Sequence, residues 1–255
     1  MIDLTGKVAL ITGASRGIGY ATAQKLAQYG ATVVLAARST KDIEKNVEDI
    51  RSKGGKAEFI TCDVSEYENV QNAINYCVEH CGSLDILVNN AGTIDPISRI
   101  VESDHEAWSK AVDVNLKGVY YGLRAALSVM EKQGQGTIIN ISSGAANSAL
   151  EGWSHYCATK AAVQSLTRCA DNEYREKGIR VIGLSPGTVS TGMMKKIKSS
   201  GINPVSKLDW STHIPSEWPA EAVAYLCTTD ADDFLGTDFS IKTEEGRKRV
   251  GLVAG

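Results

Sequence analysis

Three residues of this sequence could transfer a proton together: Ser142, Tyr156 and Lys160. Tyr156 and Lys160 are four residues apart, so on a helix they lie on one face, about one turn apart. A tyrosine with a pKa of about 10 is a poor acid or base at neutral pH, and a nearby ammonium group lowers that pKa by stabilising the phenolate. Ser142 directly follows the apolar run 137–141. The set predicts a phenol that gives a proton to a carbonyl oxygen, although this Tyr and Lys spacing also arises by chance on alanine-rich helices.

A glycine-rich turn near the start of the chain could bring a cofactor to these residues. The apolar run 7–11 is typical of a buried strand, and it leads directly into Thr-Gly-Ala-Ser-Arg-Gly-Ile-Gly at 12–19. Gly13 would allow the sharp turn, Gly17 the approach of a pyrophosphate, and Gly19 close packing of helix on strand. The helix that follows would offer free N–H groups to phosphate oxygens. A strand before this motif and a helix after it indicate nucleotide binding.

Together these motifs resemble the short-chain dehydrogenase/reductase family. The resemblance covers about residues 5 to 192 and is carried by the turn at 12–19, Asn89-Asn90-Ala91-Gly92, Asn115, Ser142, Tyr156, Lys160 and Pro186-Gly187. It implies that Asn115, Ser142, Tyr156 and Lys160 are the catalytic residues. In the family's pattern Lys160 would also bind the nicotinamide ribose. The backbone carbonyl of Asn115 would hold a water next to Lys160, through which the proton is replaced.

The end of the second predicted strand bears on the choice of cofactor. Proteins selective for NAD carry an acid there for the ribose 2′-hydroxyl, whereas a 2′-phosphate needs positive charge. Ala37 stands where the family places that acid, Arg38 follows it, and Arg16 lies in the glycine turn. Two guanidinium groups without an acid favour NADP(H). If both arginines are ordinary surface residues, NAD(H) is the alternative.

The resemblance implies further cofactor contacts. Asp63 would bind the adenine amino group with the backbone of Val64 beside it, and Val189 and Thr191 would contact the carboxamide and the phosphates. The expected cofactor-binding set is Gly13, Ser15, Arg16, Gly17, Ile18, Gly19, Arg38, Ser39, Asp63, Val64, Asn90, Ala91, Gly92, Tyr156, Lys160, Pro186, Gly187, Val189 and Thr191.

Strand and helix patterns alternate along the chain, which predicts an α/β fold. We expect a single-domain, Rossmann-like, doubly wound parallel sheet of about seven strands with helices on both faces. The strands are expected near 7–11, 32–36, 57–61, 85–88, 137–141, 179–184 and 238–241. No linker or repeat divides the 255 residues, so one dinucleotide-binding and catalytic domain should span 1–255. The candidate residues follow strand ends, so they should meet at one edge of the sheet.

Composition argues against several other classes of protein. The formal net charge of -3 offers no basic footprint for nucleic acid, and no apolar stretch is long enough for a membrane span or a signal segment. We therefore expect a cytoplasmic protein without nucleic-acid or membrane partners. Six scattered cysteines predict reduced thiols and no metal site. The resemblance implies a homodimer or homotetramer formed through helices around 115–131 and 156–175.

The substrate is the least determined part of the prediction. Residues that flank the expected catalytic strand ends are Ile94, Ser143, Gly144, Trp153 and Met193, followed by Met194 and Ile197. Most are apolar, which favours an apolar or aromatic carbonyl compound, although such clusters are also ordinary packing. The segment 188–218 has the composition of a lid over the site. The charged run 242–249 departs from the family's glycine-rich ending, so reduction of substrates on acyl carrier protein is not assumed.

Three functions remain open from the sequence. The first is an NADPH-dependent reductase of ketones or aldehydes with Tyr156 as general acid and base. The second is an NAD-dependent dehydrogenase that oxidises a small alcohol or polyol with the same residues. The third is a non-catalytic dinucleotide-binding regulator. The complete Asn, Ser, Tyr and Lys set favours an enzyme that acts on a small molecule, because a regulator has no need of proton-transfer groups.

Overall fold

Seven parallel strands form one sheet in the computed structural model, which describes residues 2–252. The first residue and the last three of the expected domain 1–255 lie outside the described residues. The strands are β1 (Val8–Thr12), β2 (Thr32–Ala37), β3 (Lys56–Thr61), β4 (Ile86–Asn89), β5 (Gly136–Ile141), β6 (Ile179–Ser185) and β7 (Asp238–Ser240). Their ends differ from the expected ones by no more than one residue, and the predicted fold class is confirmed.

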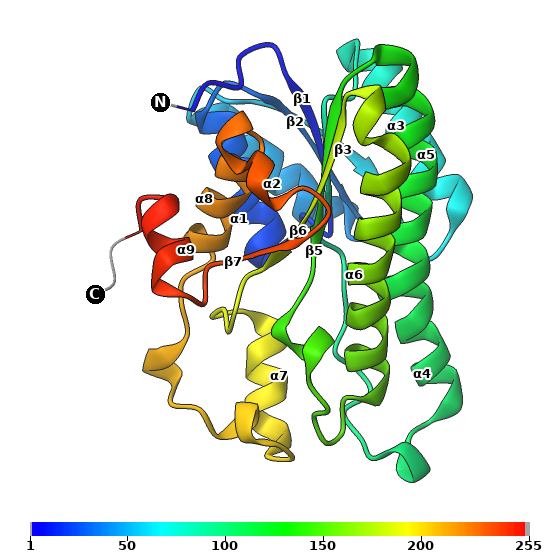
Figure 1. Cartoon of the computed structure of the whole chain (residues 1–255), viewed down its shortest axis with the longest axis vertical. Coiled ribbons are helices and arrows are strands. Elements are labelled where there is room, and N and C mark those ends of the chain that lie inside the picture. The colour runs from blue at the N-terminus through cyan, green and yellow to red at the C-terminus, as the bar shows by residue number, and fades with distance from the viewer. Residues whose placement is uncertain (1, 253–255) are drawn as a thin grey trace.

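Helices cover both faces of the sheet (Figure 1). One face packs against α1 (Gly17–Gln28), α2 (Thr40–Ser52) and α8 (Glu217–Leu226). The other packs against α3 (Tyr67–Cys81), α5 (Gly118–Gln133) and α6 (Ser154–Tyr174). The shorter helices are α4 (His105–Val112), α7 (Gly192–Ser200) and α9 (Glu244–Arg249).

The apolar runs of the sequence follow from this layered arrangement. In β1, Ala9 and Ile11 belong to the core under α1, α2 and α8, whereas Val8 and Leu10 belong to the core on the opposite face. Successive strand residues point to opposite faces, so a strand that is covered on both sides is apolar at every position. Within residues 2–252 no helix is both long and apolar enough to cross a membrane.

The strand order places the ligand-binding edge. The strands run β3-β2-β1-β4-β5-β6-β7, so the chain builds outward from β1 in one direction and then from β4 in the other. In open α/β sheets the crevice between the loops that leave two such strands is the usual ligand site. The loops after β1 and β4 carry the glycine turn and Asn90-Ala91-Gly92. At this end of the sheet, the lower end in Figure 1, α7 and the start of α6 extend beyond the strands.

Candidate active site

The glycine turn after β1 is fixed by a side chain from the neighbouring strand end. Asn90 Nδ2 donates hydrogen bonds to the carbonyl oxygens of Thr12 at 2.8 Å and Gly13 at 3.2 Å. Gly13 has φ +64°, a conformation that L side chains rarely adopt. A Cβ at Gly19 would lie 2.5 Å from both Asn90 Nδ2 and the Gly13 carbonyl oxygen. Only glycine therefore lets α1 begin this close to the turn.

Two residues that the sequence did not single out complete this support. Thr12 Oγ1 accepts hydrogen bonds from the backbone N–H groups of Asn90 (3.0 Å) and Ala91 (3.1 Å). Asn46, on the half-buried face of α2, donates to the carbonyl oxygens of Ala14 (3.1 Å) and Ser15 (3.0 Å). The only sequence signal for Asn46 is an uncharged polar residue beside the buried positions of an amphipathic helix.

The start of α1 fits a phosphate group. Gly17 has φ +58°, and the Arg16 side chain makes no capping hydrogen bond to the helix. The first N–H groups of a helix that no side chain caps are free to bind an anion. A Cβ at Gly17 would lie 3.3 Å from Thr191 Cγ2, so the residue that precedes α7 faces the glycine turn. Gly17 and Thr191, far apart in the sequence, thus come together.

Charged groups follow β1, β2 and β3 at the same edge. Arg16, Arg38 and Ser39 are exposed, while Ser15 and Ile18 are half-buried. Burial works to raise the pKa of Asp63, but hydrogen bonds from Ser65 and the charges of Arg38 and Lys110 hold that pKa below its usual value. Arg38 and Asp63 therefore lie close enough to interact.

The loops after β3, β4 and β6 supply the rest of the expected set. A Cβ at Gly118 would lie 2.9 Å from a methyl group of Val64, which places Val64 against the start of α5. Gly92 faces Asn115, whose Oδ1 would lie 3.3 Å from a Cβ at Gly92. Pro186 and Gly187 follow β6, and Val189 pairs with Ile214 in an isolated parallel bridge.

Ser142 directly follows β5, and Tyr156 and Lys160 lie in the first turns of α6. Ser142 is 2% exposed, and its Oγ has no hydrogen-bond partner among the described residues. The Lys160 ammonium lies 5.7 Å from the centre of the Tyr156 ring, in agreement with their helical spacing. Lys160 is 4% exposed, and its Nζ donates a hydrogen bond of 2.6 Å to the Ile141 carbonyl oxygen, next to Ser142.

Burial, rather than the charge of Lys160, dominates the acid–base properties of the pair. Burial raises the pKa of Tyr156, and a hydrogen bond with the Ser143 side chain, which works to lower that pKa, does not outweigh it. Burial lowers the pKa of Lys160 to about 8, against the opposing charge of Asp238. The direction for Tyr156 is opposite to the expected one, because a site shielded from water disfavours the phenolate and the ammonium alike.

Asn115 lies in a π-helical turn, Asp113–Lys117, between α4 and α5. It is fully buried, and its side chain forms a pair of hydrogen bonds with the backbone of Thr93: Oδ1 accepts from the N–H at 2.7 Å and Nδ2 donates to the carbonyl at 2.8 Å. Short π-helical segments occur often at functional sites. The amide thereby ties this turn to the segment that follows β4.

His155, which precedes Tyr156, contacts the same segment at the next residue, Ile94. It is 1% exposed, and its Nε2 lies 2.9 Å from the Ile94 carbonyl oxygen. The carbonyl can only accept, so the ring carries a proton on Nε2. Burial lowers the pKa of His155, which keeps the ring neutral. Nothing in the sequence around His155 predicts this role, because its partner is remote along the chain.

Most of the expected substrate residues form one apolar cluster at this end of the molecule. Ile94, Ala145, Trp153, Met194 and Ile197 are buried in it, and Met193 and Tyr156 pack against it. We call these residues the Trp153 cluster. Ser143 is half-buried and Gly144 is exposed; neither belongs to the cluster.

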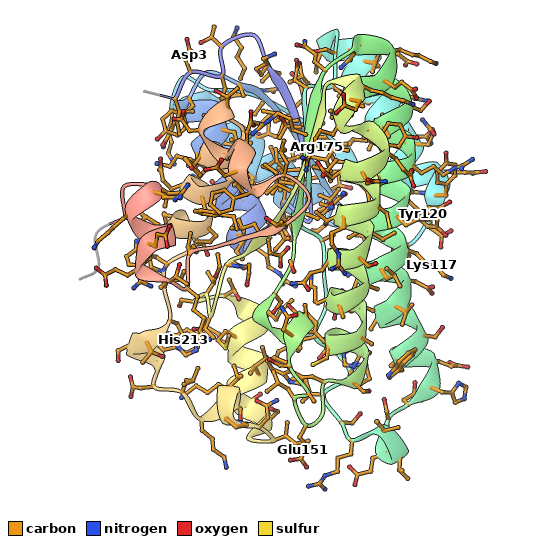
Figure 2. The ribbon with its side chains drawn as sticks, viewed as in Figure 1. Asp3, Lys117, Tyr120, Glu151, Arg175 and His213 are labelled. Carbon is orange, nitrogen blue, oxygen red and sulfur yellow. The ribbon has the colours of Figure 1, made fainter. Side chains whose placement is uncertain are left out.

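The segment 188–218, which we expected to be a lid, contributes α7 to this cluster. Lys196 on α7 forms an ion pair of 2.5 Å with Asp95, and Asn203 Nδ2 donates a 3.0 Å hydrogen bond to the Glu151 carbonyl oxygen. Figure 2 shows Glu151 in the loop ahead of α6, and His213 where the segment returns toward the sheet. The segment thus contacts both the loop after β4 and the loop before α6.

This fold, with a glycine turn at the same edge as a buried Ser142, a half-buried Tyr156 and a buried Lys160, is an arrangement typical of dinucleotide-dependent oxidoreductases. The family profile for short chain dehydrogenases matches residues 7–201. The chain is 36% identical over 255 residues to the 2,5-dichloro-2,5-cyclohexadiene-1,4-diol dehydrogenase LinX of Sphingobium indicum, covering 98% of each chain. It is 32% identical over 238 residues to the cyclohexanol dehydrogenase of an Acinetobacter strain, covering 92% of this chain and 93% of that one. The protein belongs to the short-chain dehydrogenase family and is an oxidoreductase.

Solved structures of the same fold contain either nicotinamide cofactor. NAD+-bound xylitol dehydrogenase has a TM-score of 0.87 and 25% identity, covering 93% of this chain and 98% of that one. An actinorhodin polyketide ketoreductase variant with NADPH has a TM-score of 0.86 and 28% identity, covering 92% and 95%. Family members therefore bind NAD(H) or NADP(H), and the choice in this protein depends on its own residues.

Proposed function

We propose that this protein is an NADPH-dependent reductase that converts a ketone or aldehyde carbonyl to an alcohol. The observation that carries the proposal is the buried Ser142 Oγ, which has no partner among the described residues and follows the Ile141 carbonyl that Lys160 binds, since a buried hydroxyl without a partner is expected where a ligand oxygen binds. The dinucleotide supplies the hydride when bound.

In this proposal the chain's own residues bind the carbonyl oxygen of the substrate and supply its proton. Ser142 Oγ and the Tyr156 hydroxyl donate hydrogen bonds to the carbonyl oxygen, which stabilises the negative charge that develops there. Tyr156 then transfers its proton to that oxygen. Its raised pKa keeps the phenol protonated at neutral pH, as a general acid requires. Lys160 would hold the nicotinamide ribose, and Asn115 would keep the path for proton replacement in place.

Replacing Tyr156 with Phe tests the acid. The reduction rate should fall by about 10²- to 10⁴-fold, the usual contribution of a positioned general acid, while NADPH binding persists. Tyr174→Phe at the far end of α6 is the matched control and should keep full activity. Reduction at an unchanged rate by the Tyr156 variant, with NADPH bound, would refute the assignment.

The preference for NADPH is proposed from Arg16 and Arg38, both exposed at the sheet edge where the 2′-phosphate would lie. Arg38→Ala should weaken NADPH binding by about tenfold or more, because a charged hydrogen bond is lost, and should leave NADH binding nearly unchanged. Arg168→Ala, exposed on α6, is the control. Tight NADH binding that is indifferent to Arg38 would favour the alternative cofactor.

A second function, NAD-dependent oxidation of a small alcohol or polyol, is favoured by the dehydrogenase names of several relatives. The same residues would act in reverse, with Tyr156 as base. Initial rates in both directions at pH 7, with each cofactor, distinguish the two. We further propose that the protein acts in the cytoplasm as a homodimer or homotetramer, to be tested by cell fractionation and by light scattering.

A further inference from the structure

Trp153 lies where its side chain could contact the substrate. It precedes α6 and is three residues before Tyr156, so the two side chains lie on one face of the helix. Their ring centres are 5.6 Å apart, with an interplanar angle of 75°, an edge-to-face contact. Trp153 is thus the aromatic neighbour of the proposed acid.

Within residues 2–252, the indole N–H of Trp153 has no hydrogen-bond partner. The side chain is 4% exposed, and Nε1 is shielded from solvent without an acceptor among the described residues. The other buried members of the Trp153 cluster are Ile94, Ala145, Met194 and Ile197, whose side chains offer no oxygen. By contrast, Trp108 Nε1 donates a 3.0 Å hydrogen bond to Ser154 Oγ.

An unpaired buried donor is unfavourable, and native structures rarely keep one without a reason. A phenylalanine would fill this apolar space without that cost. Ser142 Oγ, which follows β5 and which we also place at the substrate, likewise has no partner among the described residues. Of the buried side-chain atoms without a partner among the described residues, Trp153 Nε1 belongs to the side chain that packs on Tyr156, and Ser142 Oγ follows the carbonyl that Lys160 binds, so we take both to be matched to oxygen atoms of a ligand.

We propose that Trp153 donates its indole N–H to a second oxygen of the substrate, on the carbon next to the carbonyl that Tyr156 protonates. This inference depends on the proposed function and names its substrate class: ketones with a neighbouring hydroxyl or carbonyl group on an otherwise apolar skeleton. An apolar pocket with few polar groups orients its ligand through those groups. A site built to hydrogen-bond a substrate oxygen discriminates against analogues that lack it.

Two of the buried side chains around Trp153 belong to the segment 188–218. Met194 and Ile197 come from α7, and one tie of that helix to the rest of the site, the Lys196–Asp95 ion pair, is solvent-exposed at both partners. Exposed ion pairs contribute little to stability. The proposal requires α7 to shift when the substrate enters, so that the cluster opens beside Tyr156.

The test compares 2-hydroxycyclohexanone with 2-methylcyclohexanone, which has a similar shape but no second oxygen. For the wild-type protein with NADPH, kcat/KM should be about tenfold higher for the hydroxyketone, as one hydrogen bond from a buried donor gives. In Trp153→Phe that ratio should fall to about one, because only the hydroxyketone has lost a hydrogen bond. Trp108→Phe is the matched control and should keep the wild-type ratio.

The wild-type ratio alone can overturn the inference, so it does not depend on the stability of the Trp153 variant. Equal kcat/KM values for the two ketones refute it and leave the proposed function intact. So does a variant that is folded, as shown by its melting curve, and keeps the wild-type ratio. A wild-type protein that binds NADPH but reduces neither ketone, nor any ketone or aldehyde of a wider set, overturns the proposed function and this inference together.

Discussion

Lys160→Met should make the cofactor-free protein more stable at neutral pH, although it removes an essential residue. The lysine is 4% exposed, and burial lowers its pKa from 10.5 to about 8. At pH 7 the folded protein therefore holds an ammonium that would be better solvated in the unfolded chain. Methionine has a similar shape and no charge, so it relieves this penalty.

The size of the effect follows from the two pKa values. A depression of the pKa from 10.5 to about 8 corresponds to about 3 kcal/mol of destabilisation at pH 7. Between pH 8 and 10.5 the unfolded chain binds more protons than the folded one, so the stability of the wild type rises with pH. The penalty shrinks to about 1 kcal/mol at pH 10. Loss of the hydrogen bond to the Ile141 carbonyl subtracts about 1 kcal/mol from the variant's gain at every pH.

Urea unfolding of both proteins at pH 6, 7, 8, 9 and 10 measures this difference. We expect the advantage of the variant to be about 2 kcal/mol at pH 7 and to vanish near pH 10. Lys195→Met, at an exposed position of α7, is the matched control and should show no pH-dependent difference. A difference for Lys160→Met that is constant across this range would refute the assignment of a buried, weakly basic lysine.

Three further outcomes test the site and its support. The kcat/KM for carbonyl reduction should fall as pH rises through about 8, because Lys160 loses its proton there while Tyr156 stays protonated. The kcat/KM for alcohol oxidation should rise with pH. Rate profiles against pH in both directions measure this, and a flat profile up to pH 9.5 contradicts it. His155→Phe should lower the free energy of unfolding by about 1–3 kcal/mol, because the Ile94 carbonyl loses its hydrogen-bond donor. His105→Phe, on the surface, is the control and should leave that free energy unchanged. Equal stabilities of the two variants in urea would count against the hydrogen bond between His155 and Ile94. Gly122→Ala should destabilise the protein by about 1–3 kcal/mol, because a Cβ there would overlap the Asn89 side chain. Gly192→Ala is the control, because a Cβ at Gly192 meets open space. Equal melting temperatures of the two variants would exclude the clash.

The strands could be predicted because each one is a local pattern. A strand buried on both faces is an unbroken apolar run, and the order of the motifs along the chain then determines which loops share an edge. Gly13 and Gly17 could be predicted for the same reason, since a turn with positive φ demands glycine wherever it occurs.

The contacts that hold the site together could not be predicted from spacing. Asn46, Thr93 and His155 act on residues 31, 22 and 61 positions away, respectively, and such partners are set by tertiary packing alone. The pKa of Tyr156 illustrates the same limit. The four-residue spacing correctly places Lys160 near the Tyr156 ring. The direction in which the pKa of Tyr156 shifts depends on burial, which the neighbouring residues in the sequence do not determine.

The hydrogen bonds from Asn90 to the glycine turn determine when that turn can become ordered during protein synthesis. The first strand, helix and strand leave the ribosome long before residue 90, yet the carbonyls of Thr12 and Gly13 find their amide partner only when β4 has joined β1. A nascent chain that ends before β4 would carry the whole glycine motif with the support of Asn46 but without that of Asn90. Nucleotide affinity should therefore emerge late, with the central sheet, which makes the dinucleotide a ligand of the assembled domain rather than of its amino-terminal motif.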